Sequence, residues 1–289
     1  MSNINHSYIQ IQSTNTPNFS SYIYFDIANI SHCIHDVIIQ INTGPITGVT
    51  GGSIALGLPS MSSAYKWFTQ CTITNANNTL AQFDSQSNYI MNQIFTSYED
   101  VQFLNVGAGR VNDLQQRYTM SNAVGGTTWM IPIKELFQQL RPEILNTNGA
   151  LRISLLMDSL TNILNSGNLS GIGSVIINSA SLLIKISKYT QELTNMKLAA
   201  LIKQPLMKTY NSTNYQPFTV PANSTQTICA LSNFIGQNVQ FLYFVIKPTS
   251  LTKNLKNEFT KIIIIHLSMR THYSVKNEES LGTINMAYS

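Results

Sequence analysis

Charged side chains are scarce in this chain of 289 residues. Asp, Glu, Lys and Arg together make up 10% of it, against about 25% in an ordinary globular domain. The net charge of +4 therefore comes from few groups, and its field is too weak to steer a nucleic acid to the surface. Hydrophobic residues reach 43%, with 13 Tyr and 12 Phe, so we expect the chain to fold, with a preference for β structure. No specific nucleic-acid partner is expected.

Cysteines and long apolar runs are also few. The three cysteines, Cys33, Cys71 and Cys229, are widely spaced and odd in number, which gives neither a zinc pattern nor a disulfide framework. This cysteine pattern indicates a protein of a reducing compartment. No run approaches the ~18 apolar residues of a membrane span, and residues 1–19 lack the basic and apolar regions of a secretion signal. We expect a soluble protein that is not inserted in a membrane.

The familiar catalytic motifs are missing as well. The glycine-rich segment 42–63 lacks the lysine of a phosphate-binding loop, because no Lys or Arg precedes Lys66. No Gly-x-Ser-x-Gly elbow occurs, and Glu99 and Asp100 are adjacent, so their side chains diverge. We therefore predict no enzyme, no catalytic residue and no cofactor-binding residue.

One cluster contains metal-ligand residue types: His32, Cys33, His35 and Asp36. On a strand, His32 and Cys33 point to opposite faces, and a zinc site needs further ligands that converge from elsewhere in the chain. The prediction is that this cluster holds no metal.

Apolar periodicity indicates many short strands and a few helices. Strands are predicted at 22–27, 34–41, 65–74, 80–83, 129–133, 151–155, 174–189, 215–220, 226–231, 239–246 and 262–267. Helices are predicted at 85–96, 133–140, 191–203 and 251–259. Three segments rich in Gly, Asn or Ser, at 42–63, 101–128 and 161–173, are predicted to be loops, the last of them a linker between two units. The polar segment 1–19 is predicted to be an arm or an ordered edge segment, of the kind that often contacts other subunits.

The stretch 129–160 organises these predictions, because it reads as strand, short helix, turn and strand. Pro132 lies near the end of the first strand. The apolar positions of 133–140 recur every three or four residues, which gives a helix one hydrophobic face. Residues 146–149 (NTNG) suit a turn, and apolar residues of 151–155 alternate with Arg and Ser. Nothing in this stretch is a nucleophile, a base or a ligand cluster.

The pattern IPIKELFQQLRPEILNTNGALRISLLM, residues 131–157, resembles a strand, helix and returning strand of double jelly-roll major capsid proteins of virophages, Polinton-like elements and related large DNA viruses. The segment SSYIYFDIANISHCIHDVIIQI, residues 20–41, occupies the place of that family's opening strands. The resemblance extends in order from Ser21 to Leu267.

The resemblance implies an all-β fold of two jelly-roll barrels, with short helices between strands. It divides the chain into an N-terminal arm (1–20), a first jelly roll (21–165) and a second, abbreviated or truncated one (166–289). It also implies a homotrimeric, pseudo-hexameric capsomer that tiles an icosahedral shell beside minor capsid proteins. The expected location is the virion, with assembly inside the host cell.

Two alternatives remain open. The chain could be a minor capsid protein, or a spike-type or fibre-type β module in which loops 42–63 and 101–128 recognise a host ligand. The lysines Lys247, Lys253, Lys256 and Lys261 are interrupted by Glu258 and are expected to form a solvated face, or alternatively to face a packaged genome.

Overall fold

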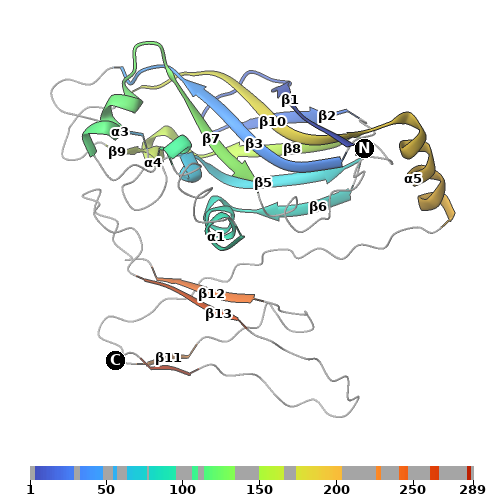
Figure 1. Cartoon of the computed structure of the whole chain (residues 1–289). Coiled ribbons are helices and arrows are strands. Elements are labelled where there is room, and N and C mark those ends of the chain that lie inside the picture. Colours follow the sequence, from blue (N-terminus) through green and yellow to red (C-terminus); the bar gives the residue numbers. More distant parts are fainter. Residues whose placement is uncertain are drawn as a thin grey trace. The chain divides into compact units, whose positions relative to one another are not determined.

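The computed structural model describes residues 4–28, 33–47, 55–56, 64–76, 78–95, 106–109, 114–133, 150–165, 174–203, 226–228, 241–246, 261–266 and 285–287. Its contacts divide the chain into two compact units. The first unit contains residues 1–213 with 249–258, and the second contains 214–248 with 259–289. In the described part of the first unit, strands contain more residues than helices do (Figure 1).

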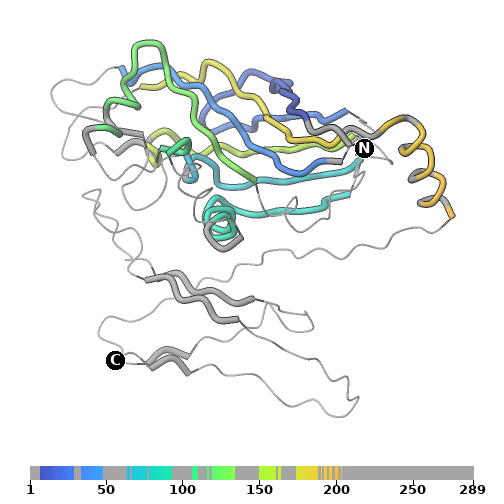
Figure 2. Tube along the Cα trace, in the orientation of Figure 1, coloured from blue at the N-terminus to red at the C-terminus, as the bar shows by residue number. Residues whose placement is uncertain are grey.

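Two four-stranded antiparallel sheets make up the first unit. The strands of the first sheet, in order across it, are β1 (Ile4–Gln12), β10 (Ile177–Tyr189), β3 (Cys33–Thr43) and β7 (Thr127–Ile133). Those of the second are β2 (Tyr22–Ile27), β8 (Leu151–Met157), β5 (Phe68–Asn75) and β6 (Asn78–Phe83). Figure 2 shows β1 and β10 side by side although they lie at opposite ends of this unit's sequence.

The strand order follows one rule. Two short strands, β4 (Ala55–Leu56) and β9 (Leu164–Asn165), pair with each other outside the sheets. Among the remaining eight, the first strand pairs with the eighth, the second with the seventh, the third with the sixth and the fourth with the fifth. This nesting, spread over two sheets, is the topology of a jelly roll. The all-β prediction is confirmed, and the first unit is a jelly-roll sandwich.

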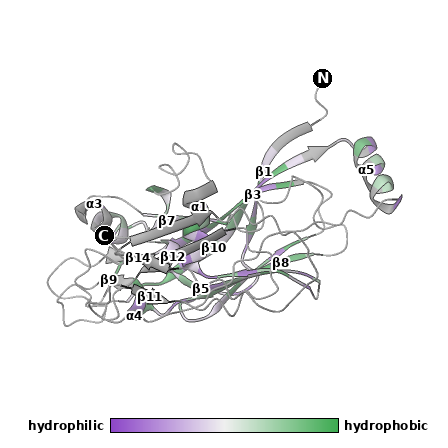
Figure 3. Cartoon of the chain, turned by 90° about the horizontal axis from the view of Figure 1, so that it is seen from below, coloured by the Kyte–Doolittle hydropathy of each residue, from purple (hydrophilic) through white to green (hydrophobic). Residues whose placement is uncertain are grey.

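The core of the first unit forms from alternate residues of both sheets. On β2, Ile23, Phe25 and Ile27 are fully buried while the residues between them face outward. Burial alternates in the same way along β8, which carries both hydrophobic and hydrophilic residues in Figure 3. Trp67, just before β5, meets Trp129 of β7 edge-on with ring centroids 5.2 Å apart, so aromatic packing joins the two sheets.

Helices lie between strands. They are the 3-10 helix η1 (Ala64–Lys66), α1 (Ser85–Phe95), α3 (Leu114–Ser121), α4 (Leu160–Ile163) and α5 (Gln191–Lys203). The helices predicted at 85–96 and 191–203 are confirmed. Asp84 caps α1, because its Oδ1 accepts the Ser87 backbone N–H at 2.7 Å. Within the predicted loop 101–128 the structure places α3, whose polar sequence gave little periodicity.

The strand pairing differs from the predicted division of the chain. Residues 4–12 form β1, an edge strand that pairs with β10 over its whole length, so they fit the predicted ordered edge segment and not an arm. The first jelly roll does not end at 165 either, since β10 lies in the centre of its first sheet between β1 and β3. Without β10, strand β1 would have no partner in the first sheet, because β10 is the strand between β1 and β3. The first unit therefore needs residues up to Tyr189.

The second unit contains two strand pairs among its described residues. One joins β11 (Gln226–Ile228) to β14 (Asn285–Ala287), and the other joins β12 (Phe241–Ile246) to β13 (Lys261–His266), both antiparallel. The helices predicted at 133–140 and 251–259 and the strand predicted at 215–220 lie outside the described residues. Where the structure describes the chain, no helix is long and apolar enough to cross a membrane.

Candidate contact surfaces

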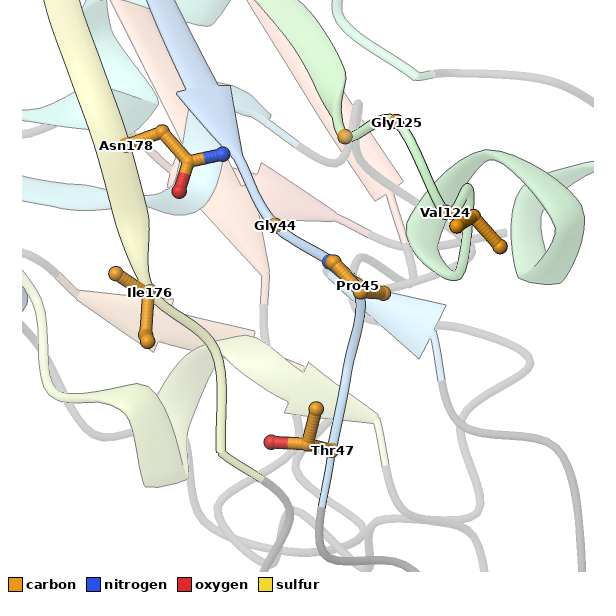
Figure 4. A pocket seen from close by; sticks show the side chains of 8 residues that line it. Gly44, Pro45, Thr47, Val124, Gly125, Ile176 and Asn178 are labelled. Atoms are coloured by element: carbon orange, nitrogen blue, oxygen red, sulfur yellow. The ribbon is translucent and has the colours of Figure 1, made fainter.

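A hollow lies where three connections meet at one end of the first sheet (Figure 4). Antiparallel order brings the end of β3 beside the starts of β7 and β10, so segments far apart in sequence come together there. The hollow has a volume of about 310 Å³. Its lining consists of Gly44, Pro45, Thr47, Val124, Gly125, Gly126, Ile176 and Asn178.

Backbone hydrogen bonds hold this hollow in shape. The Gly44 N–H donates to the Ile176 carbonyl at 2.9 Å. Thr47 and Ser174 exchange two N–H to carbonyl hydrogen bonds, both 2.8 Å long. Gly126 has φ +79°, and a Cβ there would lie 2.7 Å from the Thr43 carbonyl oxygen. The hollow is therefore built into the end of the sheet.

Two aliphatic side chains stand exposed at the hollow. Val124 is 95% exposed and Ile176 is 68% exposed, and Figure 4 shows them on different connections around it. None of its lining residues is ionisable, so the hollow offers no acid, base or charged ligand. Its volume lies at the lower limit for ligand pockets. The chemistry fits an apolar side chain better than a charged substrate.

A second surface lies on the outward face of β2 and β8. Tyr22 and Tyr24 stack with ring centroids 5.7 Å apart and planes 8° apart. The Arg152 guanidinium lies 5.5 Å from the Tyr24 ring centroid and donates to both Asp26 carboxylate oxygens, at 2.6 and 2.8 Å. Tyrosine and arginine are the side chains most enriched at binding hot spots.

The charges of this second surface compensate each other. Hydrogen bonding from Arg152, aided by its positive charge, lowers the pKa of the Asp26 carboxyl, against a smaller opposing effect of burial. The hydrogen bond to Asp26 and its negative charge raise the pKa of Arg152 in turn. The result is a nearly neutral aromatic surface, which suits a contact with protein better than capture of a polyion.

The cluster of metal-ligand residue types at 32–36 lies only partly within the described residues. His35 lies on β3, and its Nε2 shares a hydrogen bond with the Ser187 Oγ on β10; His32 lies outside the described residues. Within the described ranges, no three His, Cys, Asp or Glu side chains group so that they could hold a metal ion. Burial raises the pKa of the Cys71 thiol, which disfavours its reactive thiolate.

The sequence indicated part of the hollow and missed the aromatic surface. Loops 42–63 and 101–128, which the alternative prediction joined as a recognition surface, both contribute to the lining, but no local pattern added Ile176 and Asn178 to them. The aromatic surface had a weak signal: Tyr22, Tyr24 and Asp26 alternate with the buried residues of β2, so their shared outward face could have been predicted. Their partner Arg152 is 126 positions from Asp26 and could not.

The comparisons with known proteins find similarity among solved structures alone. No protein-family model matches the chain, and no curated protein does. Among solved structures, the chain is similar to the Faustovirus major capsid protein, with a TM-score of 0.48 and 10% identity over 70% of this chain and 56% of that chain.

Two further solved structures are similar at the same level. The PBCV-1 virus capsid gives a TM-score of 0.47 and 12% identity, over 66% of this chain and 44% of that one. The mavirus major capsid protein gives 0.41 and 10%, over 84% and 53%. This chain thus spans about half the length of the capsid proteins it is similar to. The jelly-roll assignment rests on the strand order and not on these scores.

Proposed function

We propose that the chain is a structural subunit of a viral capsid, assembles as a trimer of pseudo-hexameric outline, and resides in the virion. The observation that supports this most directly is the nested order of eight strands in the first unit. Viral capsid proteins are one of the main classes built on the jelly roll. The sequence pattern at 131–157 narrows the choice, because it resembles capsid proteins with two such barrels.

The surface of the first unit suits a protein with many contacts to copies of itself. Interface centres are depleted in Lys, Glu and Asp and enriched in aromatic residues and Arg. The exposed hollow is uncharged, and the Tyr24–Arg152–Asp26 cluster neutralises its own charges. In this proposal the second unit forms a second jelly roll, and both barrels contribute to the capsomer.

Light scattering on the purified chain tests this assembly. The expected result is a particle of three times the 32.2 kDa chain mass, and electron microscopy at high concentration should show larger regular assemblies. A chain that stays monomeric at micromolar concentration would contradict the proposal.

A second candidate function is a β-type binding module on the virion surface. The observation that favours it is the preformed hollow with Val124 and Ile176 at its surface. Shortening loops 42–63 and 101–128 separately, followed by glycan-array and cell-binding assays, distinguishes the two functions. Specific binding that is lost on shortening, by a chain that does not oligomerise, would favour the binding module.

A further inference from the structure

The two four-stranded sheets have four edge strands, and unpaired edges invite pairing with other chains. At β7 the edge contains Pro132, which has no N–H to offer. The Pro132 carbonyl accepts the side-chain amides of Asn88 and Asn92 from α1, at 2.9 and 3.0 Å. This edge is therefore closed by a helix.

Side chains and irregular pairing protect two more edges. At β2, Asn15 imitates a neighbouring strand: its Nδ2 donates to the Tyr22 carbonyl at 2.7 Å, and its Oδ1 accepts the Tyr24 N–H at 2.9 Å. The other edge strand of the second sheet, β6, has only six residues, and its pairing with β5 shifts register between Ile73 and Thr74. A short edge with a bulge is a poor template for a new strand.

The remaining edge strand, β1, has no such protection. Its nine residues pair with β10 without a register shift. The sequence INHSYIQIQ contains no Pro, Gly, Lys, Arg, Asp or Glu. Among the described residues, none pairs with the outer side of β1 over 4–12. An edge of about 30 Å without Lys, Arg, Asp or Glu is thus available, at the usual rise per residue of an antiparallel strand.

The alternation of backbone hydrogen bonds between β1 and β10 shows which N–H and carbonyl groups of β1 point outward. The Ser13 N–H donates to the Ala180 carbonyl at 2.9 Å, and these residues continue the register of β1 and β10. Antiparallel pairs alternate, so Ile9 and Ile11 also bond to β10. The N–H and carbonyl groups of Tyr8, Gln10 and Gln12 therefore point outward, and the side chains of these residues are exposed.

We propose that β1 of one copy pairs antiparallel with β1 of a second copy, which joins two four-stranded sheets into one of eight strands across a two-fold axis. Choosing a second copy as the occupant rests on the proposed capsid function. The edge of a strand is complementary only to another strand. A second copy of the chain presents the same unpaired edge at its own β1. Because β1 has no carboxylate, Lys or Arg, this symmetric contact brings no such like charges together.

The contact between two β1 strands buries a small area, so it stabilises an assembly only when it is repeated many times. One strand pair covers less than the ~1,200 Å² that a stable interface buries, and association through it should depend on concentration. In a shell the same contact recurs between trimers, and linked weak contacts add up to a stable assembly. The β1 pair therefore joins trimers to each other and does not build the trimer.

The variant Gln10→Pro tests the edge directly. The Gln10 N–H faces away from β10, so proline removes an outward donor while the backbone hydrogen bonds between β1 and β10 stay. The Gln10 Nε2 also donates to the Ser181 Oγ, and this side-chain hydrogen bond is lost in every Gln10 variant. Gln10→Thr is the matched control, because threonine keeps the N–H and suits a strand. A second test, Gln10→Lys, places added charges near the two-fold axis, and its control Ser179→Lys adds the same charge on an exposed position of the central strand β10.

Sedimentation equilibrium of the full chain over a range of concentrations measures the association. We expect Gln10→Pro and Gln10→Lys to keep the trimer and to weaken association beyond it by about tenfold or more, while both controls behave as the wild type. Association beyond the trimer that is unchanged in both Gln10 variants overturns the β1 pair and leaves the capsid proposal standing. A wild-type chain that is monomeric throughout overturns both.

Discussion

Arg152 on β8 lies directly opposite Asp26 on β2 and forms a two-pronged hydrogen bond with it, at 2.6 and 2.8 Å. Both side chains are substantially exposed, 53% for Arg152 and 37% for Asp26. The pair therefore links the edge strand of the second sheet to its neighbour on a surface that solvent reaches. Its contribution to stability is therefore small. The Arg152 guanidinium also lies 5.5 Å from the Tyr24 ring centroid.

The first prediction concerns the pH dependence of this ion pair. The pKa of Asp26 is lowered below 3.8 in the folded chain, so its stabilising effect is complete above that value and is lost as the pH falls through the folded pKa. Asp26→Asn should lower the free energy of unfolding by about 0.2–1 kcal/mol at pH 7 and by less near pH 2. Denaturant titrations at both pH values measure this. An equal difference at both would contradict the assignment.

The second prediction concerns Trp129 in the core. Its Nε1 donates to the Thr43 Oγ1 at 2.8 Å, and its ring packs on Trp67. Trp129→Ala should cost about 3–5 kcal/mol. Thr43→Val keeps the volume and leaves the buried indole N–H without its partner, at a cost of about 1–3 kcal/mol. Thermal and chemical melts would separate the two effects, and a Thr43→Val chain as stable as the wild type would show that the hydrogen bond contributes nothing.

The third prediction concerns Asn88, which is fully buried on α1 and donates to the Pro132 carbonyl. Asn88→Asp replaces the donor with a carboxylate oxygen and should cost about 3 kcal/mol or more at pH 7. Burial raises the pKa of the new acid, so the loss should shrink as the pH falls toward ~4, where the protonated acid can donate again.

The control for this substitution is Asn18→Asp, which places the same acid at an exposed position before β2. We expect it to change the free energy of unfolding by less than about 0.5 kcal/mol. Chemical denaturation of both variants at pH 4 and pH 7 would decide the matter. A cost for Asn88→Asp that does not depend on pH would rule out the lost donor as its cause.

The fourth prediction compares two neighbouring glycines of the hollow. Gly126 has φ +79°, and a Cβ there would lie 2.7 Å from the Thr43 carbonyl oxygen, whereas a Cβ on Gly125 would meet nothing within 4 Å. Gly126→Ala should therefore lower the free energy of unfolding by more than the ~1–2 kcal/mol of left-handed backbone alone. Gly125→Ala should be tolerated. Equal stability of the two variants in a thermal melt would contradict this.

Local pattern was enough to predict the positions of many elements. The alternation in β2 and β8 and the spacing in α5 depend on a few consecutive residues, and the structure has these elements where they were predicted. The absence of catalytic and phosphate-binding motifs could also be read from the sequence. These properties follow from side-chain type and period, which are local quantities.

Pairing could not be predicted in the same way. Residues 8–12 alternate polar and isoleucine, yet their short run beside polar neighbours did not single them out as a strand. Gln10 and Ser181, hydrogen-bonded at 2.9 Å, are 171 positions apart. Only the tertiary structure places them together, and with them the first sheet, its boundary at Tyr189 and the edge of β1.

The physical reason is that strands pair through backbone groups that all residues except proline share. The sequence determined which segments extend and which faces they bury, because burial depends on side chains. The order of the strands depends on how all eight pack around one core. It is set by the free energy of the whole arrangement and not by any single segment. The sequence alone thus established an all-β chain with little charge. The nested pairing, and the edge of β1 that no described residue pairs with over 4–12, arise from packing across the whole first unit.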